Sequence, residues 1–343
     1  QEERISRKIF PEFLLSLFSA VADLFKPATP PSPRIQEALN RISELVDPMV
    51  LAASGADRQL LAPLEHALGY CDGIISALPG PFEINRAAFS VDPLVHALFA
   101  TAEDIEQMLG RSQAIRDFLA EPQCWANDRF FALLAARRQQ KNQLGLAQQG
   151  DVIRRDVPQT VVYFHDQTLI EPFCILDTTL ESLRNRLFDS LLLTFREHVD
   201  ALRAQREGMR TDVAQERAHL NIIRGKAPGE EFELRSRHVD ELEAKLRETA
   251  ESLMPEQQLT ALSEFLGKPD HWLRFSEISI TIDRLGIVSD AEPDDVNVHT
   301  LKFPELRGRD KRQYAVMLAC IHREEAQAAV EAVRDQQRRY MII

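Results

Sequence analysis

The fold is decided by residues 178–224, TTLESLRNRLFDSLLLTFREHVDALRAQREGMRTDVAQERAHLNIIR. This stretch contains no proline and only one glycine, Gly208. Its apolar residues recur in steps of three and four, which is the spacing of one face of an α-helix. In the first half of the stretch they are Leu180, Leu183, Leu187, Leu191, Phe195, Val199 and Leu202. At a rise of about 1.5 Å per residue, we expect one helix of roughly 70 Å.

The second half of this helix carries charges of both signs, as expected for a helix that crosses solvent. After Pro228 and Gly229, a helical pattern resumes over residues 233–253. The simplest arrangement is a long antiparallel helical hairpin over residues 178–254, forming a coiled-coil-like arm. We expect this arm to bind a protein partner or a second copy of the chain as a homodimer, through Arg203, Arg206, Arg210 and Arg217.

The region before the hairpin shows helical periodicity interrupted by prolines and glycines. Five or six helices with short connections predict a bundle over residues 34–155. The last of these helices is expected over residues 127–144, where the apolar run FFALLAA is followed by the polar run RRQQK. Cations near the end of a helix suit its dipole.

Patterns typical of strands begin at about residue 156. The runs TVVYF (160–164) and TLI (168–170) are β-branched and aromatic, and HDQ between them is expected to turn a hairpin. Near the C-terminus, Ile278, Ile280 and Ile282 alternate with polar residues, and residues 314–321 are apolar on both faces. We therefore expect a small antiparallel sheet of three to five strands, followed by a C-terminal helix.

The predicted fold class is mainly α within an α+β architecture, combining an N-terminal helical bundle, a long helical hairpin and this small sheet. Three parts are expected. Residues 1–33 form an amphipathic helix and a proline-rich connector, and residues 34–155 form the bundle. Residues 156–343 form the sheet, with the hairpin 178–254 inserted and the last helix at the end.

The composition of the chain limits the classes of function that it can have. The 343-residue chain has a net charge of −12, which argues against general affinity for nucleic acid, because such affinity needs a basic face. No apolar run is long enough to cross a bilayer. The four cysteines lie apart among apolar neighbours and are interpreted as buried free thiols, so we expect a cytoplasmic protein.

The N-terminal segment allows three interpretations. Basic residues precede an apolar stretch that has helical spacing and includes Phe13, Leu17 and Phe18. The stretch fits an amphipathic helix docked on the protein, a helix that binds a partner or a membrane surface through residues 4–25, or a retained secretory signal. The connector PATPPSP that follows, residues 27–33, holds four prolines and is expected to be stiff and extended.

Candidate chemistry is sparse. The chain has no phosphate-binding loop and no nucleophile elbow, and we predict no cofactor. His165 and Asp166, with His322 at a strand end, are the weak catalytic candidates. Glu216 and His219 form one Glu-x-x-His unit, a weak metal candidate, but a di-iron bundle requires a second copy. His299 is a further histidine at a strand end.

Two charged loops flank the last strands. The acidic loop covers residues 290–295, and the basic turn beginning at Pro304 holds Arg307, Arg309, Lys311 and Arg312. Solvated hairpin tips explain both, and a charged docking site for a partner or an anionic surface is the alternative.

These patterns favour a non-enzymatic interaction, scaffold or assembly protein that uses the helical arm and the apolar terminal segments. Two alternatives stay open. One is an enzyme with a site between bundle and sheet near His165, Asp166 and His322. The other is a peripheral membrane protein anchored by residues 4–25.

Overall fold

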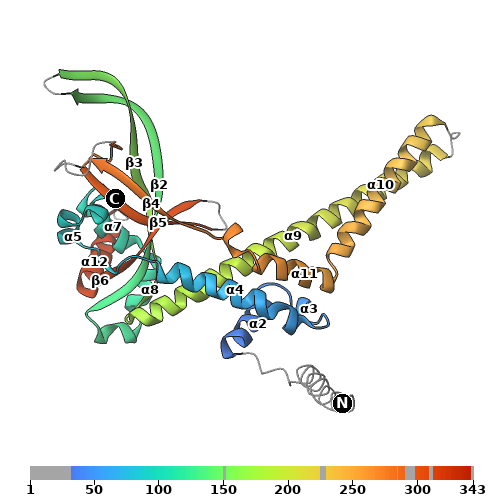
Figure 1. Cartoon of the computed structure of the whole chain (residues 1–343), viewed down its shortest axis with the longest axis horizontal. Coiled ribbons are helices and arrows are strands. Elements are labelled where there is room, and N and C mark those ends of the chain that lie inside the picture. Colours follow the sequence, from blue (N-terminus) through green and yellow to red (C-terminus); the bar gives the residue numbers. More distant parts are fainter. Residues whose placement is uncertain are drawn as a thin grey trace, which may run out of the picture.

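The computed structural model describes residues 32–149, 152–224, 229–283, 285–289, 298–308 and 312–340 (Figure 1). The α-helices in these ranges are α2 (Pro33–Leu45), α3 (Pro48–Leu51), α4 (Ala56–Ser76), α5 (Arg86–Val91), α6 (Pro93–Leu98), α7 (Ala102–Arg111), α8 (Gln113–Ala120), α9 (Leu176–Arg224), α10 (Glu230–Ser252), α11 (Pro255–Leu266) and α12 (Arg323–Tyr340). The strands are β1 (Phe82–Glu83), β2 (Arg129–Gln149), β3 (Val152–Phe173), β4 (Arg274–Asp283), β5 (Val298–Arg307) and β6 (Gln313–His322). Two short 3-10 helices, η1 (Pro122–Ala126) and η2 (Pro269–His271), complete the described elements.

The strands form one sheet in the order β3-β2-β6-β5-β4, with β1 beside β6. All pairs are antiparallel except β1–β6, which is parallel. Residues 285–289 then bridge the two edge strands. The Ile287 carbonyl accepts a hydrogen bond from the Asp283 amide of β4 (2.9 Å), and the Gly286 carbonyl accepts one from the Val162 amide of β3 (2.8 Å). The sheet is thus closed on itself at this level.

Helices cover both faces of the sheet. On one face, α6, α7, α8 and α12 pack over a core that includes Phe130, Phe164 and Phe303, and the rings of Phe164 and Phe303 meet edge to face at 5.4 Å. On the other face, the end of α4 and the start of α9 pack against Leu133 and Val316. A third cluster, built mainly by α2, α3, α4, α9 and α11 together with Leu273, lies beside the sheet.

The long helix is confirmed. Residues 176–224 form the single helix α9, and α10 folds back along it as a hairpin that projects from the body (Figure 1). Phe188, Leu191, Leu192, Phe195 and Val199 of the predicted apolar stripe and its neighbours are buried in the cluster beside the sheet. A period of 3.6 residues in the apolar positions is a signal within one stretch of sequence, so this helix can be predicted without tertiary information.

The predicted fold class is wrong in two respects, although α+β holds at the coarse level. The sheet has six strands rather than three to five, and the predicted bundle loses its last helix, because residues 129–149 form β2. Leu133 packs into the core on one face of the sheet and Leu134 into the core on the other. A strand buried on both faces shows no alternation, so its apolar run resembles a buried helix.

The predicted turn at residues 165–167 is also wrong, because β3 runs unbroken from Val152 to Phe173. The register between β2 and β3 shifts at three places. The non-glycine residues with positive φ in this strand are Asp156 (61°), Asp166 (55°) and Glu171 (54°). Each lies at one of the shifts, so these are β-bulges that bend the hairpin. Aspartate tolerates the left-handed region and is therefore common both in β-bulges and in turns. For this reason a bulge at Asp166 resembles a turn at the sequence level. The predicted domain boundary after residue 155 falls inside β3.

Gly286 is expected to be required for closure of the sheet. Its φ is +77°, and a Cβ at this position would lie 2.6 Å from the carbonyl oxygen of Val162. Gly286→Ala should therefore lower the free energy of unfolding by about 1–3 kcal/mol, the usual size of backbone strain at one residue. Thermal and urea unfolding measure the loss.

The matched control is Gly208→Ala in α9. A Cβ added at Gly208 would meet no other atom within 4 Å, and the φ of Gly208 is not positive. Alanine in the interior of a helix is more stable than glycine by about 1 kcal/mol, so this variant should be as stable as the parent or more so. Equal effects of the two substitutions would contradict the closure argument.

Candidate interaction surfaces

We define the helical arm as residues 203–224 of α9 together with α10. Buried and partly buried residues recur along both helices in alternating steps of three and four. In α9 they are Arg206, Met209, Val213, Glu216, Leu220 and Ile223, and in α10 they include Phe232, Val239, Leu242 and Leu246. Only Val213 and Val239 among the described residues of the arm are fully buried. The seam between the helices therefore buries little apolar surface.

Ion pairs hold the two helices together. Arg217 Nη2 lies 2.7 Å from Glu243, and Arg235 Nη1 lies 3.1 Å from Glu216. Glu216 and Arg235 sit in the seam, with 25% and 37% of their side chains exposed. Two of the predicted cation and metal candidates, Arg217 and Glu216, thus serve the internal structure of the arm. His219 is exposed one turn further on.

The other predicted arginines of the arm are placed differently. Arg203 anchors the base of the arm, because it binds Asp47 at the start of α3 and Asp200, the latter at 3.2 Å. Arg210 is exposed and pairs with Glu207 at 3.4 Å. The Nε of Arg206 is buried and has no hydrogen-bond partner among the described residues.

The surface of the arm is charged and carries two exposed apolar side chains. Ile222 near the end of α9 is 60% exposed, and Leu234 near the start of α10 is 58% exposed. Helix α10 contains eight carboxylates and four cations. Residues 203–224 contain five arginines and three carboxylates. One helix of the arm is therefore acidic and the other basic.

The hairpin of β2 and β3 forms a second projection, which the sequence did not predict (Figure 1). Arg137 is the last residue of β2 that pairs with β6. Beyond it, residues 138–149 pair with β3 alone and span about 40 Å. Leu144 and Leu146 on this ribbon are 67% and 63% exposed.

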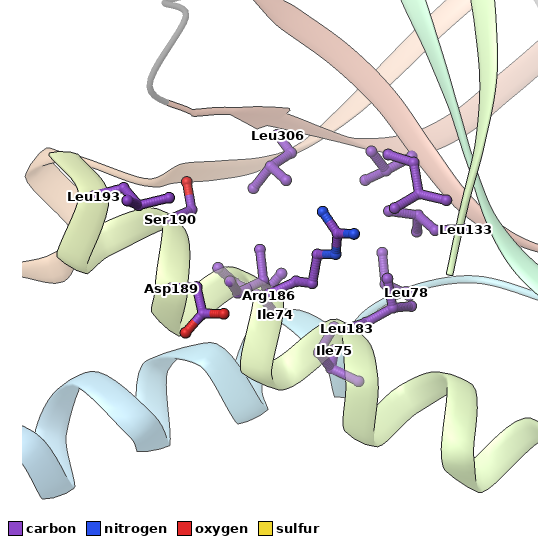
Figure 2. A pocket seen from close by; sticks show the side chains of 13 residues that line it. Ile74, Ile75, Leu78, Leu133, Leu183, Arg186, Asp189, Ser190, Leu193 and Leu306 are labelled. Carbon is purple, nitrogen blue, oxygen red and sulfur yellow. The ribbon is translucent and has the colours of Figure 1, made fainter. Parts of the chain in front are cut away.

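A groove lies between helices α4 and α9 and the sheet (Figure 2). We call it the helix–sheet groove; its volume is about 380 Å³. Arg186 extends from α9 toward the sheet, between Leu306 and Leu133. Its guanidinium pairs with Glu171, which also accepts a hydrogen bond from Ser182. The lining residues are Ile74, Ile75, Leu78, Leu133, Ile170, Leu183, Arg186, Leu187, Asp189, Ser190, Leu193, Leu306 and Val316.

Of the catalytic candidates, His165 and Asp166 are in contact, but His322 lies far from both. His165 Nδ1 lies 3.0 Å from Asp166, and Arg137 lies 3.8 Å from the same carboxylate. His322 pairs in register with Arg129 of β2, whereas His165 pairs with Arg137. At about 3.4 Å per residue, the two histidines are about 27 Å apart along the strand.

No metal site is formed by the described residues, which hold no group of three or more His, Cys, Asp or Glu side chains placed to share an ion. His299 lies at the start of β5, opposite Ile282, in a separate cavity between α5, α6 and the sheet.

Of the predicted basic turn, Arg307 belongs to β5 and Arg312 is exposed just before β6. Arg309 and Lys311 lie outside the described residues, as do the acidic loop at 290–295 and the segment with Phe13, Leu17 and Phe18.

The cysteine prediction is confirmed for two positions. Cys71 and Cys320 are buried free thiols, and Cys174 is partly buried. Burial raises the pKa of the Cys71 thiol to about 12. This thiol therefore stays protonated at neutral pH and is a poor nucleophile.

Comparison of the chain with protein-family models, with curated proteins and with solved structures found no match in any of the three. Among the described residues, no helix combines the length and the hydropathy needed to cross a bilayer. The functional argument for the candidate surfaces therefore depends on the geometry of this structure.

Proposed function

We propose that this protein is a non-enzymatic assembly protein that binds a protein partner, in the simplest case a second copy of itself, through the helical arm. The observation that carries the proposal is the arm's poor self-burial: two helices project from the body and, among their described residues, bury fully only Val213 and Val239. At 1.5 Å per residue, α10 alone is about 35 Å long. A projection of this size adds little to the stability of the body, and its large surface is available to a partner.

Charge complementarity supports self-association. A two-fold axis places the same surface of each copy against the other, so α9 of one arm can lie on α10 of its partner. The basic stretch 203–224 would then face the acidic α10. Complementary charge sets register and association rate, and the exposed Ile222 and Leu234 supply the apolar contacts at the tip.

The test is the mass of the full chain in solution, measured by size-exclusion chromatography with light scattering. We expect a dimer that dissociates in the double variant Ile222→Glu, Leu234→Glu. Both side chains are exposed, so the fold should be unaffected, as circular dichroism will check. The matched control is Leu144→Glu, Leu146→Glu on the β-ribbon, which should leave the dimer intact.

Raised salt should also weaken the dimer, because surface charges are screened. The proposal is contradicted if the full chain is monomeric at high concentration and binds no protein partner that the double variant Ile222→Glu, Leu234→Glu fails to bind. Equal loss of the dimer in both double variants would place the interface elsewhere.

A further inference from the structure

We propose that the helix–sheet groove is the docking site for residues 13–25 of the same chain. This inference is independent of the function proposed for the arm. It concerns a different surface, and it assigns an occupant to a cavity that the rest of the described chain leaves open.

The groove has the chemistry of a site for apolar side chains. Leucine, isoleucine and valine residues from α4, α9 and four strands make up most of its lining. The groove volume of about 380 Å³ is many times the roughly 10–15 Å³ that holds one water molecule, so side chains can enter it. Filling it with apolar groups gains both transfer free energy and dispersion contacts.

Residues 13–25 supply matching side chains. On a helix, Phe13, Leu17, Phe18 and Val21 share one face, with Leu24 and Phe25 continuing it. A contiguous apolar stripe of this kind is costly to leave in water. The segment thus needs a surface that is concave and apolar, and the groove is such a surface.

The described chain leads to the edge of the groove. Arg34, in the first turn of α2, donates two hydrogen bonds to Asp72 of α4, at 2.7 and 2.8 Å. Arg184 of α9 binds the same carboxylate at 3.3 Å. The lining residues Ile74 and Leu183 are close neighbours of Asp72 and Arg184 in sequence. The start of α2 is therefore held about one helical turn from two walls of the groove.

The connector is long enough to close the remaining gap. Seven residues, 26–32, connect the segment to Pro33 at the start of α2, and a proline-rich connector of seven residues reaches roughly 22 Å at about 3.1 Å per residue. The path around half of a helix about 10 Å in diameter is roughly 16 Å. Tethering on this scale gives an effective concentration in the millimolar range, so even a weak contact would be largely formed.

The experiment is photo-cross-linking of the full chain with p-benzoylphenylalanine in place of Phe18. We expect a product of monomer mass whose cross-linked peptides contain residues 74–78 or 183–193. In Ser190→Trp, which places a large side chain in the groove, the yield should fall to background. Leu193→Glu is a second blocking variant, should Ser190→Trp fail to fold. The matched control is Leu144→Trp on the β-ribbon, which should leave the yield unchanged.

Three results would overturn the proposal. The first is a product of dimer mass, which would mean that the segment docks on a second copy. The second is cross-linking to lipid alone when vesicles of phosphatidylethanolamine and phosphatidylglycerol are added. The third is the absence of a cross-link to the groove, or a yield unchanged by both blocking variants.

Discussion

Replacing Glu305 by alanine is expected to lower the free energy of unfolding by about 3–5 kcal/mol. The Glu305 side chain is 4% exposed, and that of its partner Arg138 is 14% exposed. Arg138 reaches across the sheet from β2 to β5, and its Nη2 lies 3.2 Å from Oε2 of Glu305. Removing the carboxylate leaves a guanidinium in a low-dielectric setting without its counter-charge.

Urea unfolding at neutral pH measures this loss, with an unchanged dependence on denaturant as the sign that only stability has changed. The double variant Arg138→Met, Glu305→Leu is the matched control. It removes both charges and keeps much of the volume, so it should lose less stability than Glu305→Ala. A loss below about 1 kcal/mol for Glu305→Ala would show that the pair is effectively solvated.

Replacing Phe195 by alanine is expected to cost a similarly large amount, about 3–5 kcal/mol, as for other buried aromatic side chains. Phe195 is 2% exposed in the cluster beside the sheet. Its ring meets that of Phe265 in α11 edge to face, with the centroids 5.3 Å apart. The loss combines apolar area, an aromatic pair and the cavity left between α9 and α11.

Two controls set the scale for the loss of stability in Phe195→Ala. Phe195→Leu keeps most of the volume and should lose less. Leu144→Ala, at a position 67% exposed, should change stability by no more than about 0.5 kcal/mol. If Phe195→Ala and Leu144→Ala have similar midpoints in thermal unfolding, Phe195 does not lie in a cooperative core.

Among the candidate surfaces, the helical arm was predictable and the others were not. The arm rests on the periodicity of one continuous stretch and on the turn that ends it. The helix–sheet groove draws Ile75, Leu133, Leu183 and Leu306 from distant parts of the chain. No local pattern marks residues that meet only through strand pairing. Glu305 shows the same limit: the sequence placed it in a basic turn, yet its partner Arg138 is 167 residues away.

Elements with a local signal can be predicted from the sequence alone. The apolar steps of three and four specify α9, and the alternation of Ile278, Ile280 and Ile282 specifies β4. The strand at residues 129–149, in contrast, depends on contacts with distant parts of the chain. Its alanines and leucines favour a helix locally, but over residues 129–137 pairing with β3 and β6 buries both faces of the strand. Burial in two cores outweighs a helix preference of a few tenths of a kcal/mol per residue.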